Sequence, residues 1–146
     1  MQMKIKRVRE NALLPVRASS GAAAFDLHVC LDEDIVILPG QYKNLPTGIA
    51  IELPGPEYVA LIFSRSGHGA KHGVSLVNSV GVIDSDYRGE IQIGLINHGS
   101  EPLTVCNGDR VAQMMITTCF APELIESDSL SETERGAGGF GSTGVR

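Results

Sequence analysis

Apolar residues recur at every second position along much of this chain, and this period of two constrains its fold more than any other feature. The segments FDLHV (25–29), GIAIEL (48–53) and EIQIGLI (90–96) all follow it. Successive side chains of a strand point to opposite faces, so each segment predicts a half-buried strand. The predicted inward-facing residues are Phe25, Leu27, Val29, Ile49, Ile51, Ile91, Ile93 and Leu95.

Three further segments are more continuously apolar, which is typical of strands covered on both faces: DIVIL (34–38), YVALIF (58–63) and VAQMMITTCF (111–120). Turn signals separate the predicted strands: Pro39-Gly40, Pro54-Gly55, His98-Gly99 and Asn107-Gly108. Short strands at this spacing, without a long helical pattern, indicate an all-β sandwich, jelly roll or barrel. Only SRSGHGAKHG (64–73) predicts a short helical turn.

The composition changes after Phe120. APELIESDSLSETE (121–134) is acidic and rich in serine, and five glycines then surround Phe140 in the last twelve residues. With 146 residues the chain is long enough for one domain with a real core. We therefore expect a folded body over residues 1–120 and a flexible arm over residues 121–146.

Charge and cysteine content exclude several classes of protein. A net charge of −5 argues against a general nucleic-acid or membrane binder, which needs a broad basic surface. Three cysteines without C-x-x-C spacing favour a reduced protein with buried thiols. The N-terminus MQMKIKRVRE is too charged for a signal peptide. These features predict a cytoplasmic protein, or a nuclear or host-cytoplasmic one if the source is eukaryotic or viral.

The segment SRSGHGAKHG (64–73) contains the components of an anion cradle. Its glycines present backbone N–H groups without Cβ obstruction, and Arg65 and Lys71 add positive charge. The segment lacks the P-loop pattern and fails the nucleophile-elbow pattern at Ser64. A polar surface loop is the alternative. A pair between Ser66 and a neighbouring histidine is disfavoured, because loop histidines are usually just solvated.

The segment GVIDSDYRGE (81–90) predicts a β-hairpin whose turn carries two carboxylates and an aromatic ring. Turn aspartates often only hydrogen-bond their own backbone. The alternative is that one carboxylate activates a water molecule as a general base. The residues alone do not decide between Asp84 and Asp86 for that role.

The segment GDRVAQMM (108–115) runs from a turn into a predicted strand. Arg110 and Gln113 interrupt its apolar pattern, and burying either without a partner is costly. Each therefore has a structural partner or faces a cleft.

Taken together with AAAFDLHV near the start, SRSGHGAKHG, GVIDSDYRGE, GDRVAQMM and RGAGGFGSTG resemble the five ordered motifs of the trimeric dUTPases. The resemblance extends from about residue 3 to the C-terminus. It implies a jelly-roll-like β-barrel of the dUTPase type, assembled as a homotrimer with shared active sites. The implied reaction is hydrolysis of Mg²⁺-bound dUTP to dUMP and pyrophosphate, which supplies the dTMP precursor and keeps uracil out of DNA.

The resemblance also implies roles for individual residues. Asp84 would orient and activate the water that attacks the α-phosphorus, near Gln113, and Tyr87 would pack under the deoxyribose. Asp26 would belong to the outer shell of the metal, which the substrate phosphates mainly hold. The implied substrate-binding residues in the body are Arg65, Ser66 and Gly67 for the phosphates, and Asn78, Val80, Gly81 and Ile83 for the uracil.

The glycine-rich tail gains a role from the same resemblance, as a lid that closes over bound nucleotide. Phe140 would stack on the uracil, and Gly141 is implied as a further substrate-binding residue. Arg135, Ser142 and Thr143 would meet the γ-phosphate.

The chain departs from the family pattern at Ala24, Ser64 and His68, where glycine, proline and an apolar residue are usual. Ala24 bears on the backbone near Asp26. Three rival interpretations follow: a dCTP deaminase or bifunctional enzyme on the same fold, a regulatory binding protein, and a structural jelly-roll domain. The intact I-D-S-D-Y-R-G stretch and the complete tail motif favour the hydrolase.

Overall fold

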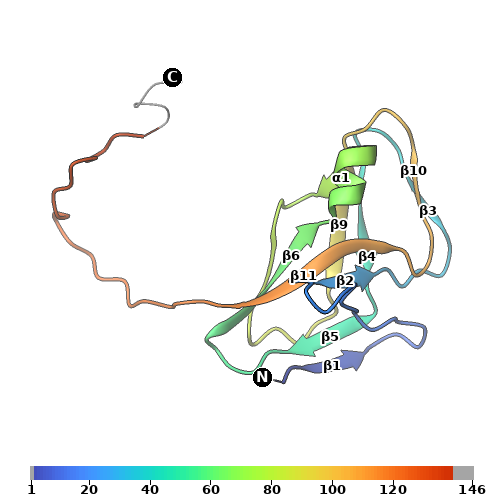
Figure 1. Cartoon of the computed structure of the whole chain (residues 1–146), viewed down its shortest axis with the longest axis horizontal. Coiled ribbons are helices and arrows are strands. Elements are labelled where there is room, and N and C mark those ends of the chain that lie inside the picture. Colours follow the sequence, from blue (N-terminus) through green and yellow to red (C-terminus); the bar gives the residue numbers. More distant parts are fainter. Residues whose placement is uncertain (1, 140–146) are drawn as a thin grey trace.

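The computed structural model describes residues 2–139, and nearly all of their regular structure is β-strand (Figure 1). The all-β prediction is confirmed, and the helical turn predicted within residues 64–73 is a short helix. In chain order the elements are β1 (Lys4–Arg7), β2 (Phe25–His28), β3 (Ile35–Ile37), β4 (Tyr42–Pro46), β5 (Ile49–Glu52), β6 (Tyr58–Ser64), α1 (Ser66–His72), β7 (Val74–Leu76), β8 (Gly81–Ile83), β9 (Gln92–Asn97), β10 (Leu103–Val105) and β11 (Arg110–Thr118).

The strands pair antiparallel in four sheets. The largest has the order β2-β11-β6-β8, and a second has the order β4-β9-β7. Two pairs, β1-β5 and β10-β3, complete the arrangement. Because β11 lies between β2 and β6, the last strand of the described residues joins an early strand to a middle one.

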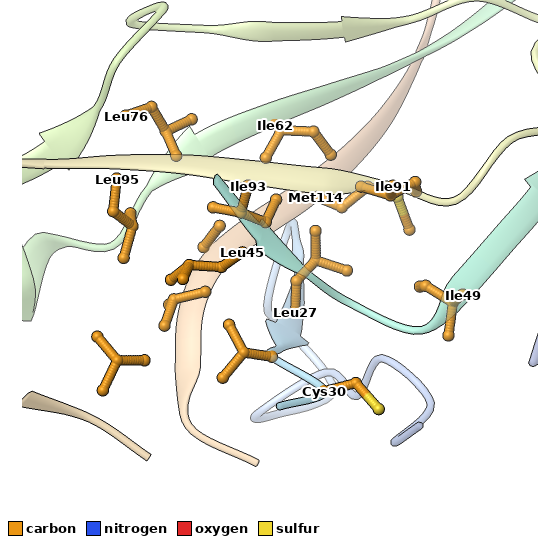
Figure 2. Close-up of a cluster of buried hydrophobic side chains, with 14 of the residues drawn as sticks. Leu27, Cys30, Leu45, Ile49, Ile62, Leu76, Ile91, Ile93, Leu95 and Met114 are labelled. Atoms are coloured by element: carbon orange, nitrogen blue, oxygen red, sulfur yellow. The ribbon is translucent and has the colours of Figure 1, made fainter. Parts of the chain in front are cut away.

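The core is made by the inward faces that the period of two predicts (Figure 2). Ile91, Ile93 and Leu95 are each at most 1% exposed, and Leu27 and Ile49 pack into the same cluster. Fully burying one such side chain stabilises a fold by about 1.5–3 kcal/mol. A one-residue register slip would turn this whole face to solvent, so the alternation fixes the pairing.

Three expectations need correction. Val36, in the segment predicted to be covered on both faces, is 49% exposed because β3 lies in a two-stranded sheet. Residues 81–90 form no hairpin, since β8 pairs with β6 whereas β9 pairs with β4 and β7. The connection from β8 to β9 runs over residues 84–91, longer than a tight hairpin loop. All three cysteines are free, but only Cys30 is buried.

Residues 119–139 contain no helix or strand, and in Figure 1 they run away from the sheets. Within residues 121–139 the hydrogen bonds in the structure stay local, such as Arg135 Nε to the Gly138 carbonyl at 2.8 Å. None of the described helices is long and apolar enough to cross a membrane. The division into a body and an arm at residue 120 stays a prediction.

Candidate active site

Asp26, Arg65 and Arg110 form a partly buried ion-paired group, which we call the arginine cluster. Asp26 Oδ1 accepts from Arg65 Nε at 3.0 Å, and Oδ2 accepts from Arg110 Nη1 at 3.1 Å. Asp26 lies in β2 and is only 8% exposed. Burying a carboxylate is costly unless it is paired, and the two guanidinium groups supply that pairing. Because β11 pairs with both β2 and β6, the sheet brings all three residues together.

A histidine extends the arginine cluster. The carbonyl oxygen of Arg110 accepts a hydrogen bond from Arg65 Nη1 at 2.9 Å and lies 3.0 Å from His68 Nε2. Since a carbonyl only accepts, His68 must donate from Nε2, which leaves its buried Nδ1 without a protein partner among the described residues. On the neighbouring strand, burial lowers the pKa of His28 below its usual value, although the Asp26 charge opposes the shift. His68, which stands where the family usually has an apolar residue, thus adds a hydrogen bond to the arginine cluster.

The predicted phosphate-binding residues lie where α1 begins. Arg65 is the N-cap residue, with φ −87° and ψ 136°, and Ser66 and Gly67 open the helix. The first N–H groups of a helix have no intrahelical acceptor, so they are available to a ligand. A Cβ placed on Gly67 would meet open space. This end of the helix is therefore accessible.

Gln113, in β11, donates from Nε2 to the backbone carbonyl of Ser64 at 2.9 Å. The Ser64 hydroxyl in turn accepts the backbone N–H of Leu76 at 2.9 Å, a bond that proline could not make. Like Arg110, Gln113 has a structural partner in the structure. The two bonds connect the end of β6 to β11 and β7.

A small cavity of about 90 Å³ lies beside β8. Three of the predicted uracil-binding residues, Asn78, Gly81 and Ile83, line it together with Ile62, Leu76 and Gln92. Val80 lies in the turn before β8 and is exposed. The turn is tight, because the Val80 N–H reaches the Asn78 carbonyl at 2.7 Å. The structure thus brings these residues together, with Val80 at the rim outside the cavity lining.

Residues 84–90, which we call the carboxylate loop, follow β8 directly. Asp84, Asp86 and Tyr87 are exposed there. The Tyr87 N–H bonds the Asp84 carbonyl at 3.2 Å, closing a turn, and the Tyr87 hydroxyl donates to the Glu90 carbonyl at 3.0 Å. Within residues 2–139, the carboxylates of Asp84 and Asp86 take part in no hydrogen bond or ion pair of the structure. Both remain open to solvent and ligand.

Glu90 closes the loop through its own set of bonds. It accepts from Arg9 Nε at 2.6 Å and Nη2 at 3.2 Å, from the Gly48 N–H at 2.8 Å and from Gln92 Nε2 at 2.9 Å. The Arg9 hydrogen bond is the main reason that the pKa of Glu90 lies below its usual value. We call Arg9, Gly48, Glu90 and Gln92 the glutamate node. Sequence reasoning missed it, because Arg9 and Gly48 lie far along the chain from Glu90, and the motif that ends at Glu90 does not reveal these partners.

The remaining predicted residues lie in the tail. Arg135 is exposed and bonds only within its own segment in the part of the chain that the structure describes. Phe140, Gly141, Ser142 and Thr143 lie outside the described residues.

Known sequences match this chain along almost its whole length. A family model described as dUTPase matches residues 10–144. A relative from Desulfitobacterium hafniense (strain DSM 10664 / DCB-2), named deoxyuridine 5'-triphosphate nucleotidohydrolase, is 52% identical over 147 residues. The match covers 99% of this chain and 97% of the relative.

Solved structures agree with the sequence matches. A point-mutant dUTPase of Staphylococcus bacteriophage 80alpha, described with dUpNHpp, is 27% identical with a TM-score of 0.86, covering 99% of both chains. A point-mutant dUTPase of S. aureus phage phi11, whose description names a structural Mg(II) ion, has a TM-score of 0.80 at 23% identity. It covers 88% of this chain and 98% of its own, and at that identity it supports the fold alone. The predicted jelly-roll-like fold is confirmed.

Proposed function

The chain belongs to the dUTPase family, and from that premise we propose that it hydrolyses dUTP to dUMP and pyrophosphate. The observation that carries the proposal is the position of β8 (Gly81–Ile83). This strand lines the small cavity and leads directly into the exposed Asp84. A base-sized recess beside a free carboxylate suits a nucleotide whose phosphate chain is attacked by water. The product dUMP would serve as dTMP precursor, and removal of dUTP would keep uracil out of DNA.

Asp84 is proposed as the general base. Its exposed carboxylate would orient a water molecule and take its proton while the water oxygen attacks the α-phosphorus. The bond from that phosphorus to the oxygen bridging to the β-phosphate breaks, and pyrophosphate leaves. Gln113, held on β11 by its bond to Ser64, would contact the α-phosphate and the attacking water.

The cavity beside β8 is proposed to bind the uracil. Asn78 and the backbone of Val80, Gly81 and Ile83 would supply the hydrogen bonds that read the base edge. Tyr87 would lie against the deoxyribose, where a 2′-hydroxyl would clash.

The beginning of α1 is proposed to bind the phosphates through Arg65, Ser66 and Gly67. Arg65 uses Nε for Asp26 and Nη1 for the Arg110 carbonyl. Its Nη2 has no protein partner among residues 2–139 and remains available for a phosphate oxygen. The arginine cluster would thus hold the guanidinium in place before substrate arrives.

The residues of the site fit a Mg²⁺ ion held mainly by the substrate. The described residues contain no group of three or more His, Cys, Asp or Glu side chains that would hold a metal. Asp26 has one oxygen on each arginine, and each oxygen keeps a lone pair that a metal-bound water would use. We propose Asp26 as an outer-shell residue. Bound Mg²⁺ would offset the negative charge of the triphosphate.

The arm is proposed to close over the nucleotide. Ordering backbone costs roughly 1–2 kcal/mol per residue, whereas one aromatic ring stacked on a base returns only ~1–3 kcal/mol. Phe140 alone therefore cannot hold the arm down. Charge-assisted hydrogen bonds from Arg135, Ser142 and Thr143 to the γ-phosphate would supply the rest, and Gly141 would also contact the nucleotide.

We further propose a homotrimer whose subunits share the active sites. Support comes from an apolar surface recess of about 310 Å³ lined by Met3, Ile5, Leu14, Pro15, Phe25, Met114 and Ile116. Leu14 is exposed and most of the other lining residues are half-buried, and a second copy would cover this apolar recess. Light scattering during size-exclusion chromatography would give the mass of one chain if this proposal is wrong.

The test of the function is product analysis with dUTP, dCTP, dTTP and UTP in parallel, with Mg²⁺ and then with EDTA. Pyrophosphate and dUMP from dUTP alone are the expected products. Ammonia released from dCTP would instead favour the deaminase on the same fold. Folded protein that binds dUTP without turnover would favour the regulatory binder.

A further inference from the structure

We propose that Glu90 is a positioning residue that sets the preference for deoxyribose by holding Tyr87 in place. The inference rests on the proposed function, because it concerns how the same site would distinguish dUTP from UTP. Glu90 ends the segment GVIDSDYRGE, but the sequence assigns it no role, and its carboxylate lies in the glutamate node.

The glutamate node is more elaborate than a surface ion pair. Glu90 accepts from two N–H groups on one edge of the Arg9 guanidinium, so the pair is bidentate, and it also accepts a backbone N–H from Gly48. Its side chain is 19% exposed, against 41% for Arg9. These contacts join three segments: the end of β1, the turn between β4 and β5, and the start of β9. The Glu90 side chain is thereby fixed from three directions.

The link from Glu90 to Tyr87 runs through one peptide plane. The Glu90 carbonyl accepts the Tyr87 hydroxyl at 3.0 Å, and the N–H of the same peptide unit, from Ile91, donates to the Ile49 carbonyl at 2.9 Å. Because a peptide unit is planar, fixing one edge fixes the other. The node and the Ile49 bond therefore set where the Tyr87 hydroxyl rests.

Gly89 shows how closely the tyrosine ring follows the backbone. A Cβ at this position would overlap the hydroxyl and ring carbons of Tyr87. The ring thus lies directly over the segment that Glu90 ends. A shift of that segment by a few tenths of an ångström would move the ring with it.

The chain offers a matched control in a second carboxylate–cation pair. Lys4 Nζ and Glu52 Oε1 lie 2.8 Å apart on β1 and β5, with side chains 80% and 42% exposed. No hydrogen bond joins this pair to the carboxylate loop, although Arg88 of that loop lines the same recess as Lys4 and Glu52, and its charge helps lower the pKa of Glu52. The pair is therefore a carboxylate–cation control that lacks the hydrogen-bonded link to Tyr87.

The first experiment compares kcat/KM for dUTP and for UTP in the wild type, Glu90→Gln and Glu52→Gln. We expect Glu90→Gln to lower the dUTP:UTP ratio by about tenfold, equivalent to roughly 1.4 kcal/mol, because the 2′-hydroxyl is then less strongly excluded. Glu52→Gln is expected to keep the wild-type ratio. A purely structural role would lower both activities together, and an unchanged ratio in Glu90→Gln would overturn the proposal.

A double-mutant cycle with Tyr87→Phe checks the route. This variant removes the hydroxyl that reaches the Glu90 carbonyl, so Glu90→Gln should change the ratio much less in that background than in the wild type. An equal effect in both backgrounds would mean that Glu90 acts elsewhere. Arg9→Gln, which leaves the Gly48 and Gln92 bonds intact, serves if Glu90→Gln does not fold.

A second measurement needs no turnover. The chain has three tyrosines, Tyr42, Tyr58 and Tyr87, so fluorotyrosine labelling gives three ¹⁹F NMR signals. The signal that disappears in Tyr87→Phe belongs to Tyr87. Glu90→Gln should shift the Tyr87 signal, and Glu52→Gln should not. A wild type inert towards dUTP would refute the proposed function, while this spectrum would still decide whether Glu90 positions Tyr87.

Discussion

The arginine cluster and the carboxylate loop carry opposite arrangements of charge. In the cluster, Asp26 is buried and both of its oxygens are paired with guanidinium groups. In the loop, Asp84 and Asp86 are exposed, and the loop is ordered by a different residue, Glu90. The contrast teaches that groups which bind can be fixed in advance by their mutual attraction. Asp84, the proposed general base, is left open, and neighbouring residues set its position instead.

The largest effect is expected from loss of the free carboxylate of Asp84. Asp84→Asn should lower kcat by about 10²- to 10⁴-fold, the usual contribution of a general base, without loss of the fold. Asp86→Asn is the matched control on the same turn and should retain activity within about tenfold. Steady-state kinetics with dUTP and thermal unfolding check both. If Asp86→Asn is the inactive variant, the roles of the two aspartates are reversed.

The second-largest effect is expected from loss of the arm. It tests whether the arginine cluster and the carboxylate loop are enough for turnover of dUTP. Deletion of residues 135–146 should leave the unfolding transition unchanged and lower kcat/KM about 10²-fold, since hydrogen bonds to charged groups contribute about 1.5–3 kcal/mol each. Phe140→Ala should cost less, because it removes one stack and leaves the contacts to the γ-phosphate in place. Full activity of the shortened chain would show that the arm has no part in turnover.

Asp26→Asn addresses the arginine cluster itself. Removing the shared carboxylate leaves two guanidinium groups facing each other, so we expect a loss of about 2–3 kcal/mol in the free energy of unfolding, reduced from the fully buried case by the exposure of the arginines. Urea unfolding at low and high salt measures this. Glu52→Gln should change the stability little, and a comparable loss there would mean that burial is not what makes the cluster strong.

The smallest effect is a pH dependence at the glutamate node. Because the pKa of Glu90 is lowered in the fold, chiefly by Arg9, its contribution to stability is present above the usual value of about 4.3. It is lost as the pH falls through the lower folded-state value. The stability difference between wild type and Glu90→Gln should therefore narrow below about pH 4 in urea unfolding. A difference that stays constant from pH 7 to pH 3 would exclude an ionised Glu90 as its cause.

Local sequence patterns predicted most of the fold but only part of the candidate site. The period of two predicted the strands around Leu27, Ile49 and Ile93, because neighbouring residues of a half-buried strand alternate between the buried and the exposed face. The same local logic failed at residues 81–90, since the partner of β8 is β6, about twenty residues away along the chain. Strand pairing depends on which edges meet, and alternation alone does not specify that.

The site shows the same limit at the level of single residues. Asp84 and Tyr87 stand in a recognisable motif, whereas the partners of Asp26 lie 39 and 84 positions along the chain from it. Arg9 reaches Glu90 across 81 positions. Charges that attract each other only after folding leave no local signal, so the pairing of Asp26 and the role of Glu90 needed the structure.

The pairing of β2 with β11 also has a consequence for synthesis on the ribosome. Asp26 leaves the exit tunnel long before Arg110 is made, so the carboxylate has no second cation until most of the chain has emerged. Strands that are far apart in the sequence pair slowly, and their apolar edges stay exposed until they do. We therefore expect nascent chains that end before β11 to remain unfolded and to depend on chaperones. The last strand would then complete the sheet and the phosphate end of the site in one step.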